Sequence, residues 1–593
     1  MRSVMMMHEP TREYAYPVAR DRLVLRLKCL RDDAGSFFAY YCNRFHDAEF
    51  TRLQMDCTGR DGEYSYYSCE IATGEAVKYI RYYFERAGEE GSVCFGVNGM
   101  ESLRPSQCFE YLYTNECDVF AVPEWAAGAV FYQVFPERFC NGDPTNDPDN
   151  TQPWGGSPTR DNFFGGDLKG ILSRLDYIAG LGADVIYLNP VFKSPSNHKY
   201  DTEDYYAIDP SFGTMEDMKE LVQGCHSRGL RVVLDGVFNH CGYMFPPFQD
   251  VLKNGAMSAY ADWFFIDSFP VRTDPLNYEC VGYYKWMPKL RLKNRAVREY
   301  FINVGTWWIR ETGVDGWRLD VADEVDFTFW QEFRRAVKSV REDAILIGET
   351  WKDGRNLLCG DQMDSVMNYL FRDAAVAFFA QNGISAEQFD NRIQRMLSLY
   401  PRMVYPVLYN LIGSHDTPRF LTLCGGDPDR MRLAVAFQMA FPGAPAVYYG
   451  DELAMAGEND PDCRHTMDWE RGDRYMLAFY RQLISLRREN PALRHGGFQS
   501  VVCQDGVYGF ARTLEGETVY VLLNNSGEER RFSVPLLGRG PLKSLMDGHI
   551  YAPDEADGAE RFFHSDSNRY VAKIGMALPA RRFDIIKQGG MKG

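Results

Sequence analysis

Short apolar runs alternate with amphipathic segments between residues 129 and 450. The apolar runs predict strands at 129–135, 183–190, 230–238, 314–320, 344–349, 365–369, 407–414 and 444–450. The amphipathic segments predict helices at 168–182, 215–229, 294–313, 327–343, 386–399 and 429–441. Eight successive strand–helix units are typical of a (β/α)8 TIM barrel. The segment 239–293 is aromatic, proline-rich and weakly periodic, so we expect an inserted subdomain after the third strand.

The two ends of the chain show a different pattern, in which short β-type runs are separated by Gly and Asp. Such runs predict antiparallel β-sandwiches. We therefore expect a multidomain protein with an N-terminal β-sandwich at 1–122, the catalytic barrel at 123–502 and a C-terminal β-sandwich at 503–593.

Composition narrows the class of protein. A formal net charge of −17 argues against a nucleic-acid partner, which would need a basic surface. Fifteen cysteines without metal-type spacing predict reduced thiols and a cytoplasmic location. The first residues do not resemble a signal peptide and no apolar run reaches 18 residues, so we expect no membrane association.

Polar side chains follow several of the predicted barrel strands. The carboxyl ends of barrel strands meet at one face, so groups that follow different strands gather there. Asp320 ends the fourth predicted strand and Glu349 ends the fifth. Two neighbouring carboxyl groups suit retaining glycoside hydrolysis, in which one attacks the anomeric carbon and the other protonates the leaving oxygen.

The residues around this pair fit the same chemistry. Arg318 lies two positions before Asp320 and shares its strand face, so we expect it to keep Asp320 ionised. The apolar strand behind Glu349 is expected to raise the pKa of that acid. Asp416 and His415 follow the seventh strand, and Asp235 and His240 the third. A single Asp at a strand end is most often a helix cap or an ion pair, but polar ends on four strands of one barrel favour a site.

These residues lie in four strings: DGVFNH (235–240), GWRLDVADE (316–324), GETW (348–351) and NLIGSHDTPR (410–419). The strings resemble the conserved regions of the alpha-amylase superfamily, glycoside hydrolase family 13. VFYQVFPERFCNGDP (130–144), FFGGDLKGI (163–171), NHKYDTEDYYAIDPSFGT (197–214) and MPKL (287–290) resemble its cyclomaltodextrinase, neopullulanase and maltogenic amylase branch. The resemblance implies a glycosidase that cleaves α-1,4-glucosidic bonds in cyclodextrins, maltooligosaccharides and pullulan, with possible transglycosylation.

The resemblance also assigns residues and a partner. It implies that Asp320 is the nucleophile, Glu349 the acid/base and Asp416 the transition-state stabiliser. It further implies a set of substrate-binding residues, with Trp351 on the acceptor side: Arg318, His240, His415, Tyr200, His198, Trp351, Asp460 and Arg464. In this branch the N-terminal sandwich commonly helps to form a homodimer, although such a sandwich could instead be a carbohydrate-binding module on a monomer.

The loop NGDPTNDPDN (141–150) gathers oxygen donors of the kind that Ca²⁺ prefers. The resemblance implies a structural calcium site with these ligands: Asn141, Asp143, Asn146, Asp147, the Gly165 carbonyl and Asp167. Asx turns without a metal would produce the same composition.

Three other functions remain open at this stage. An α-glucosidase or oligo-1,6-glucosidase could use the same barrel, but such enzymes usually lack the long N-terminal sandwich. A non-catalytic barrel, like the amylase-like subunits that chaperone transporters, would carry a membrane span and would have lost catalytic carboxylates. The function of a pure glucan-binding protein would survive Asp320→Asn, whereas an enzyme would lose turnover.

Overall fold

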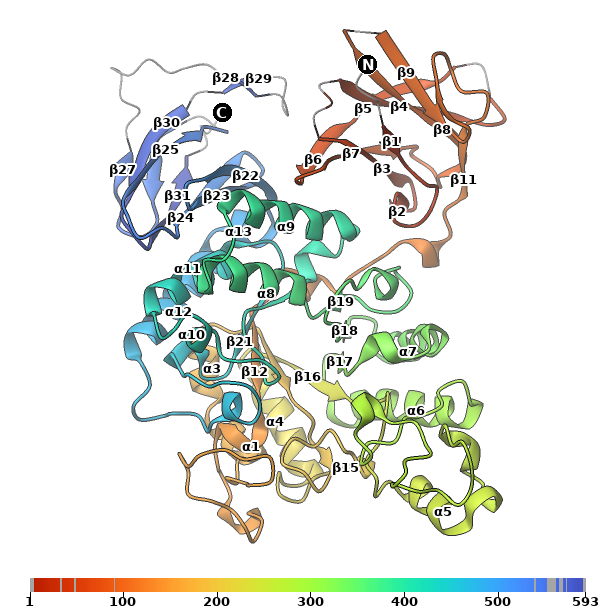
Figure 1. The fold of residues 1–593 in the computed structure, drawn as a ribbon, viewed down its shortest axis with the longest axis vertical. Coiled ribbons are helices and arrows are strands. Elements are labelled where there is room, and N and C mark those ends of the chain that lie inside the picture. The colour runs from red at the N-terminus through yellow and green to blue at the C-terminus, as the bar shows by residue number, and fades with distance from the viewer. Residues whose placement is uncertain are drawn as a thin grey trace.

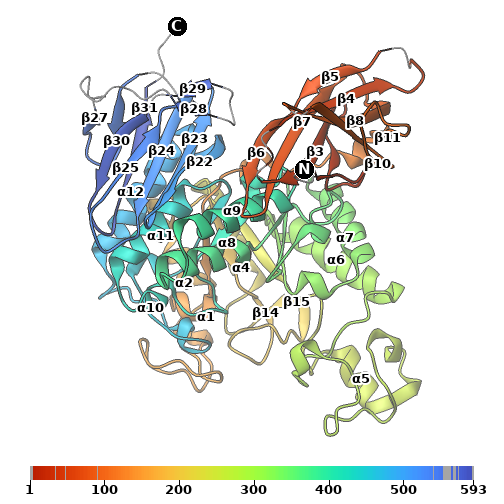
Figure 2. The ribbon, with the colours of Figure 1, turned by 45° about the horizontal axis from the view of Figure 1, so that its top comes forward.

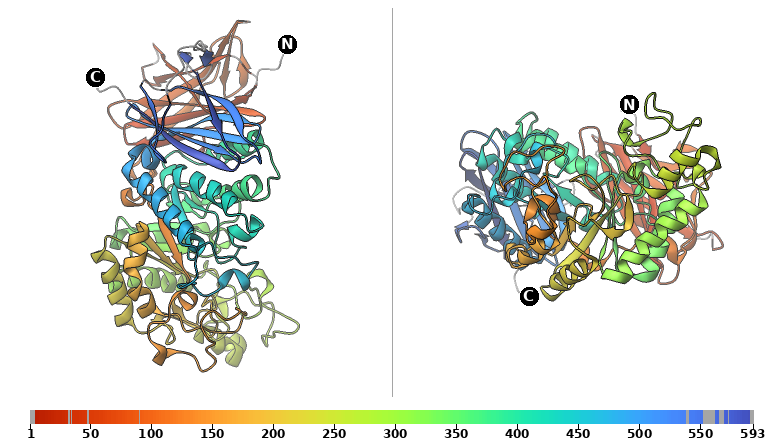
Figure 3. Two further views of the ribbon diagram at one scale, coloured as in Figure 1. Left: turned by 90° about the vertical axis from the view of Figure 1, so that its left-hand side faces the viewer. Right: turned by 90° about the horizontal axis from the view of Figure 1, so that it is seen from below.

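The computed structural model describes residues 5–589 except 32, 34, 47–48, 90, 538–539, 552–561, 565–568 and 572. A central barrel carries one β-sandwich from each end of the chain, and both sandwiches lie at the same end of the barrel (Figures 1 and 2). In the side view on the left of Figure 3, both sandwiches lie above the barrel, with the C-terminal one in front. Every helix among the described residues is too short or too polar to span a bilayer.

Eight parallel strands form the barrel, in agreement with the predicted runs. They are β12 (Phe131–Val134), β13 (Val185–Leu188), β16 (Arg231–Gly236), β17 (Gly316–Leu319), β18 (Ile345–Gly348), β19 (Ser365–Val366), β20 (Tyr409–Leu411) and β21 (Ala444–Tyr448). The sheet order is β19-β18-β17-β16-β13-β12-β21-β20, and a parallel bridge between Met367 and Tyr409 joins its two edges. The strand residues are almost entirely buried, because helices cover the outside of a closed parallel sheet.

Capping residues mark the ends of several outer helices. The main ones are α4 (Met215–Ser227), α6 (Arg295–Thr312), α7 (Phe327–Val340), α9 (Ala386–Leu399), α11 (Pro428–Ala440) and α12 (Arg474–Glu489). Thr214 and Ser385 form capping boxes at the starts of α4 and α9, which satisfies amide groups that the first helical turn leaves without partners. Gly313 ends α6 in the left-handed conformation that glycine adopts without strain.

The structure differs from the predicted elements in three places. The helix expected at 168–182 is divided into α2 (Leu168–Ser173) and α3 (Leu175–Leu181), because Arg174 has the non-helical angles φ −109° and ψ 7°. A hairpin of β14 (Phe192–Lys193) and β15 (Asp204–Ile208) follows the second barrel strand. Helix α8 (Tyr369–Ala375) continues as a π-helical turn, and its mainly buried surface gives no amphipathic pattern.

The segment 239–293 forms the expected excursion between β16 and α6. It contains α5 (Pro246–Asn254), three short 3₁₀ turns and isolated antiparallel bridges such as His240 with Lys289. Figure 2 shows α5 projecting from the barrel at the end away from the sandwiches.

The N-terminal domain is a sandwich of two antiparallel sheets. One sheet contains β1 (Met6–Met7), β2 (Ala15–Ala19), β3 (Arg22–Leu30), β6 (Asp56–Arg60) and β7 (Tyr64–Ala72). The other contains β4 (Ser36–Asn43), β5 (Thr51–Gln54), β8 (Lys78–Gly88), β9 (Gly91–Gly96), β10 (Gly99–Glu101) and β11 (Phe109–Tyr113). Alternate residues of each strand fill a separate apolar core between the sheets.

The C-terminal domain is also built from antiparallel strands, and its first strand begins at Gly497. Its main sheet contains β22 (Gly497–Gln504), β23 (Val507–Leu514), β24 (Glu517–Asn524), β31 (Arg582–Gln588), β26 (Leu542–Ser544) and β27 (Ile550–Tyr551). The pair β25 (Arg530–Pro535) and β30 (Lys573–Leu578) packs over it. Residues 590–593 of the expected domain lie outside the described residues.

Candidate active site

The carboxyl ends of four barrel strands bring the expected polar groups together. Asp235 lies near the end of β16, Arg318 lies within β17, and Glu349 directly follows β18. Each side chain is buried, because barrel strands leave little room for water around residues that point inward. Asp320 directly follows β17 and is also buried, with 5% of its surface exposed.

The guanidinium of Arg318 connects three carboxyl groups. Nη1 donates to Asp235 Oδ1 at 2.9 Å and to Asp320 Oδ1 at 2.8 Å, and Nη2 lies 2.9 Å from Glu349 Oε2. Asp320 and Glu349 are therefore held against the two terminal nitrogens of one planar group. Asp235 therefore holds Arg318, and the shared guanidinium fixes the separation of the candidate catalytic pair.

The protonation of Asp320 differs from our expectation. Burial and the neighbouring Glu349 carboxylate raise the pKa of Asp320 well above its usual range, while Arg318 acts in the opposite direction. A single cation cannot neutralise three buried carboxylates, so the cluster favours retention of a proton. Arg318 therefore orients Asp320 but does not by itself keep it ionised. Because the groups interact strongly, the proton belongs to the cluster as a whole.

Glu349 is oriented by two further donors. The Val321 amide donates to its Oε2 at 2.9 Å, and the Trp351 indole N–H donates to its Oε1 at 3.1 Å. Trp351 stacks on Tyr369 with ring centroids 4.2 Å apart and remains 44% exposed. The carboxyl group thus has a fixed position, and an exposed aromatic face lies beside it.

His415 belongs to a buried network that includes residues missed by the sequence reasoning. The Gln133 side-chain amide, from β12, donates to His415 Nδ1 at 2.8 Å, which leaves the ring proton on Nε2. That nitrogen lies 2.5 Å from the Tyr200 hydroxyl, which donates to Asp235 at 3.0 Å. Asn189 donates to Tyr200 and accepts from Gln133. Burial holds the pKa of His415 well below its usual value, so the ring is neutral.

His240 lies beside Asp320. Its Nε2 is 4.0 Å from Asp320 Oδ2, is buried, and has no hydrogen-bond partner among the described residues. Burial lowers the pKa of this histidine to about 3, so the ring is neutral. Lys289, from the MPKL string, pairs with the backbone of His240 and donates to Asn239 at 2.5 Å. An unpaired buried nitrogen beside the candidate nucleophile is well placed to bind a substrate hydroxyl.

Asp416 is held at the rim by Arg464. The guanidinium contacts Asp416 Oδ1 at 3.2 Å, the His415 carbonyl at 2.8 Å and Asp460 Oδ1 at 3.0 Å. Asp416 keeps 26% of its side chain exposed, which leaves it accessible to a ligand. His198 lies near these charges, with its ring centroid 5.9 Å from that of Tyr200. The structure therefore brings together every residue that the sequence proposed for substrate contact.

The 141–150 loop packs against Gly165 and Asp167. The amide nitrogens of Asn141 and Asn146 donate to Asp147 and Asp167, respectively, so their oxygens face away from these bonds. Both oxygens are buried without a hydrogen-bond partner among the described residues. Two such oxygens beside carboxylates fit a hard cation. Asp143 fits less well, because Lys169 already donates to it at 2.6 Å.

Comparisons with known proteins agree with this geometry. Residues 133–475 match the alpha amylase catalytic domain, and residues 1–115 match the alpha amylase N-terminal ig-like domain. A cyclomaltodextrinase from Geobacillus thermopakistaniensis is 44% identical, over 93% of this chain and 96% of that protein. Neopullulanase 2 from Thermoactinomyces vulgaris is 45% identical, over 88% and 91%. A solved cyclomaltodextrinase structure superposes with a TM-score of 0.90 at 36% identity, covering 98% and 99% of the two chains.

A barrel with paired carboxyl groups at its catalytic rim defines a glycosidase. The chain belongs to the alpha-amylase family, since the family match covers more than half of it and close relatives align over most of its length. Its similarity is to the branch that contains cyclomaltodextrinases and neopullulanases. The α-glucosidase alternative is not favoured by these relatives.

Proposed function

We propose that this protein hydrolyses α-1,4 bonds in cyclodextrins, maltooligosaccharides and pullulan with retention of configuration, and transfers some glycosyl groups to sugar acceptors. The carrying observation is the arrangement of Asp320 and Glu349 on the two terminal nitrogens of Arg318. The names of the similar proteins supply the substrate class.

In the first step, a carboxylate oxygen of Asp320 attacks the anomeric carbon while Glu349 gives its proton to the departing glycosidic oxygen. The C–O bond to the leaving sugar breaks, and a glycosyl ester forms on Asp320. Glu349, now ionised, then accepts a proton from water, whose oxygen attacks the same carbon and releases Asp320. An acceptor sugar that takes the place of water on the exposed face of Trp351 gives a transfer product.

The remaining polar groups bind the sugar that undergoes reaction. His415 and Tyr200 are fixed by the network that begins at Gln133, and His240 has an unpaired nitrogen beside the nucleophile. Asp416 accepts hydrogen bonds from ring hydroxyls. These hydrogen bonds become stronger as positive charge develops at the anomeric centre. Asp460 and His198 extend this side of the site, and Arg464 orients Asp416.

We also propose a structural Ca²⁺ in the 141–150 loop. The ion would be held by Asn141, Asn146, Asp147, Asp167 and the Gly165 carbonyl. Its only role would be to link the loop to the start of α2. Addition of EDTA is expected to lower the melting temperature, and added Ca²⁺ to restore it, in differential scanning fluorimetry. An Asn146→Ala variant should melt lower and respond less to either reagent; an unchanged EDTA response would contradict the assignment.

The N-terminal sandwich is proposed to form a homodimer contact. Exposed apolar side chains gather on it, among them Phe45 (65% exposed), whose ring packs against Tyr79 at 5.1 Å, and Leu112 (56%) on the strand paired with β8. Analytical ultracentrifugation of wild type and Leu112→Asp tests this contact. A monomeric wild type would overturn it. We place the protein in the cytoplasm, a proposal supported by its fifteen reduced cysteines.

The first test is product analysis after incubation with β-cyclodextrin, pullulan or soluble starch, with Asp320→Asn in parallel. We expect ring opening to maltose and glucose, panose from pullulan, slower attack on starch and an inactive variant that still binds substrate. Glucose from isomaltose without attack on cyclodextrin would instead establish an α-glucosidase.

A further inference from the structure

A connected set of hydrogen bonds runs from Asp235 through the inside of the barrel. The Tyr187 and Tyr200 hydroxyls donate to Asp235 Oδ2 at 2.6 and 3.0 Å. The side-chain nitrogen of Asn189 donates to the same two hydroxyls at 3.4 and 3.0 Å, and its oxygen accepts from Gln133 at 3.0 Å. Asp235, Asn189 and Gln133 are each 1% exposed, so bulk water does not compete for these bonds.

The direction of each bond is fixed by the Asp235 carboxylate. Both of its oxygens accept from Arg318, at 2.9 and 3.1 Å, and an ionised carboxylate can only accept. Both tyrosine hydroxyls therefore give it their single protons and can only accept from Asn189. This turns the Asn189 nitrogen toward the hydroxyls and its oxygen toward Gln133, which must present its own nitrogen. The second N–H of Gln133 then meets His415 Nδ1 at 2.8 Å.

This orientation decides the charge of His415. Its Nε2 lies 3.1 Å from Asp416 Oδ2, and a carboxylate at that distance favours a charged imidazolium ring. Nδ1, however, faces an N–H of Gln133, which leaves no acceptor for a second ring proton. Burial acts in the same direction, because it lowers the pKa of His415 well below its usual value. The other polar and charged side chains that act on the ring are those of Tyr200, His198, Arg318 and Arg464.

A charged His415 would bind Asp416 in an ion pair, and the carboxylate would be less available to sugar hydroxyls. We propose that Gln133 and Asn189 are positioning residues of the hydrolytic reaction. They hold an amide donor against Nδ1 of His415, which keeps the ring neutral. Asp416 then remains free to accept from the reacting sugar. This inference rests on the proposed function, in which Asp416 binds ring hydroxyls.

The test is nuclear magnetic resonance of the full-length protein labelled with ¹³C,¹⁵N-histidine, whose ring shifts distinguish charged rings and the two neutral tautomers. The His415 signal is assigned by its loss in His415→Asn. We expect a neutral wild-type ring with its proton on Nε2 between pH 5 and 8. In Gln133→Glu an acceptor faces Nδ1, so the ring should be charged at pH 7. The matched control is Gln438→Glu, a buried glutamine on α11 that donates to the Asn410 and Ala446 carbonyls, and His415 should stay neutral in it.

Activity provides a second measurement. In Gln133→Glu, kcat/KM for β-cyclodextrin should fall at least about tenfold at pH 7, because small displacements of positioned groups are costly. It should recover as the pH rises and the ring loses its extra proton, whereas Gln438→Glu should keep the wild-type pH profile. Gln133→Met and Asn189→Leu remove the donor or its support without adding a charge, so they serve if Gln133→Glu does not fold. Both should lose more activity at pH 5 than at pH 8.

Three results overturn the proposal. The wild-type His415 ring is charged at pH 7, or it carries its proton on Nδ1. The ring remains neutral at pH 7 in Gln133→Glu. Gln133→Met and Asn189→Leu lose the same fraction of activity at pH 5 and pH 8. The histidine signals are measured without substrate, so the two failures are distinguishable: a wild type that leaves β-cyclodextrin intact contradicts the proposed function, whereas a charged wild-type ring contradicts the role of Gln133 and Asn189.

Discussion

Asp235→Asn should shift the acid limb of the pH profile of catalysis to lower pH. The Asp235 and Asp320 oxygens both lie within 2.9 Å of Arg318 Nη1, so they are less than about 6 Å apart. Two charges at that separation repel by about 3 kcal/mol at an effective dielectric constant of about 20. Removal of one charge therefore lowers the pKa of Asp320.

The direction of the change in the variant follows from the direction in which the native protein shifts the pKa of Asp320. Burial and neighbouring carboxylates raise the pKa of Asp320, so loss of a neighbouring negative charge lowers it. Asp320 must be ionised to attack the anomeric carbon, and it loses its proton at lower pH in the variant. The acid limb of kcat/KM for β-cyclodextrin should therefore move to lower pH.

The assay is initial-rate measurement across pH 4 to 9 at constant ionic strength. Asp323→Asn is the matched control, because Asp323 is an exposed carboxylate that accepts from Thr350 at 2.9 Å, outside the Arg318 cluster. Its profile should overlay the wild type. If Asp235→Asn loses the same fraction of activity at every pH, with the acid limb in place, the electrostatic reasoning is refuted and Asp235 acts only by positioning Arg318.

Two further predictions concern the active site, and a third concerns His8 in the N-terminal sandwich. Glu349→Gln should slow β-cyclodextrin hydrolysis about 10² to 10⁴-fold but 4-nitrophenyl maltoside much less, since that leaving group needs no proton; equal losses would contradict an acid role. Trp351→Phe keeps the stack on Tyr369 and should retain transfer products that Trp351→Ala loses, as measured by chromatography. Burial lowers the pKa of His8 to about 4, so protonation of the unfolded chain costs about 2 kcal/mol of stability as pH falls from 8 to 5. In calorimetry, the first unfolding transition of His8→Gln should not lose this stability as the pH falls. If the variant and the wild type respond to pH in the same way, His8 is not the source of the loss.

Much of the barrel could be predicted because its strands are short buried runs between polar loops. The same constraint placed Asp320 and Glu349 together, since neighbouring parallel strands end at one rim. The division of the helix at Arg174 left no sequence signal, because the apolar face formed by Leu168, Ile171, Leu175 and Ile178 continues across the break.

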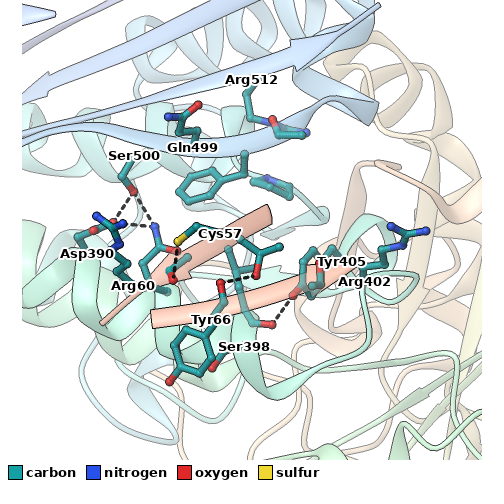
Figure 4. A pocket seen from close by; sticks show the side chains of 18 of the residues that line it. Cys57, Arg60, Tyr66, Asp390, Ser398, Arg402, Tyr405, Gln499, Ser500 and Arg512 are labelled. Carbon is teal, nitrogen blue, oxygen red and sulfur yellow. Dashed lines mark hydrogen bonds between the residues drawn. The ribbon is translucent and has the colours of Figure 1, made fainter. Parts of the chain in front are cut away.

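Other features depend on long-range contacts that no local pattern encodes. The pKa of Asp320 depends on how many carboxylates share Arg318, which only the closed barrel decides. Gln133 did leave a signal: a lone amide inside an apolar strand needs a buried partner. A cavity lined by Arg60, Asp390 and Ser500 (Figure 4) combines residues from all three domains, so no single segment of the sequence indicates it.

The bond between Gln133 and His415 bears on when the molecule first becomes active. Its two ends are 282 positions apart, on the first strand of the barrel and just after the seventh. A partly folded chain that lacks the later strands has neither His415 in place nor its proton on the correct nitrogen. Recovery of hydrolysis after dilution from denaturant should therefore lag behind the recovery of helical circular dichroism. The recovery of the enzyme's own turnover would therefore report the time at which the last long-range step of its folding is completed.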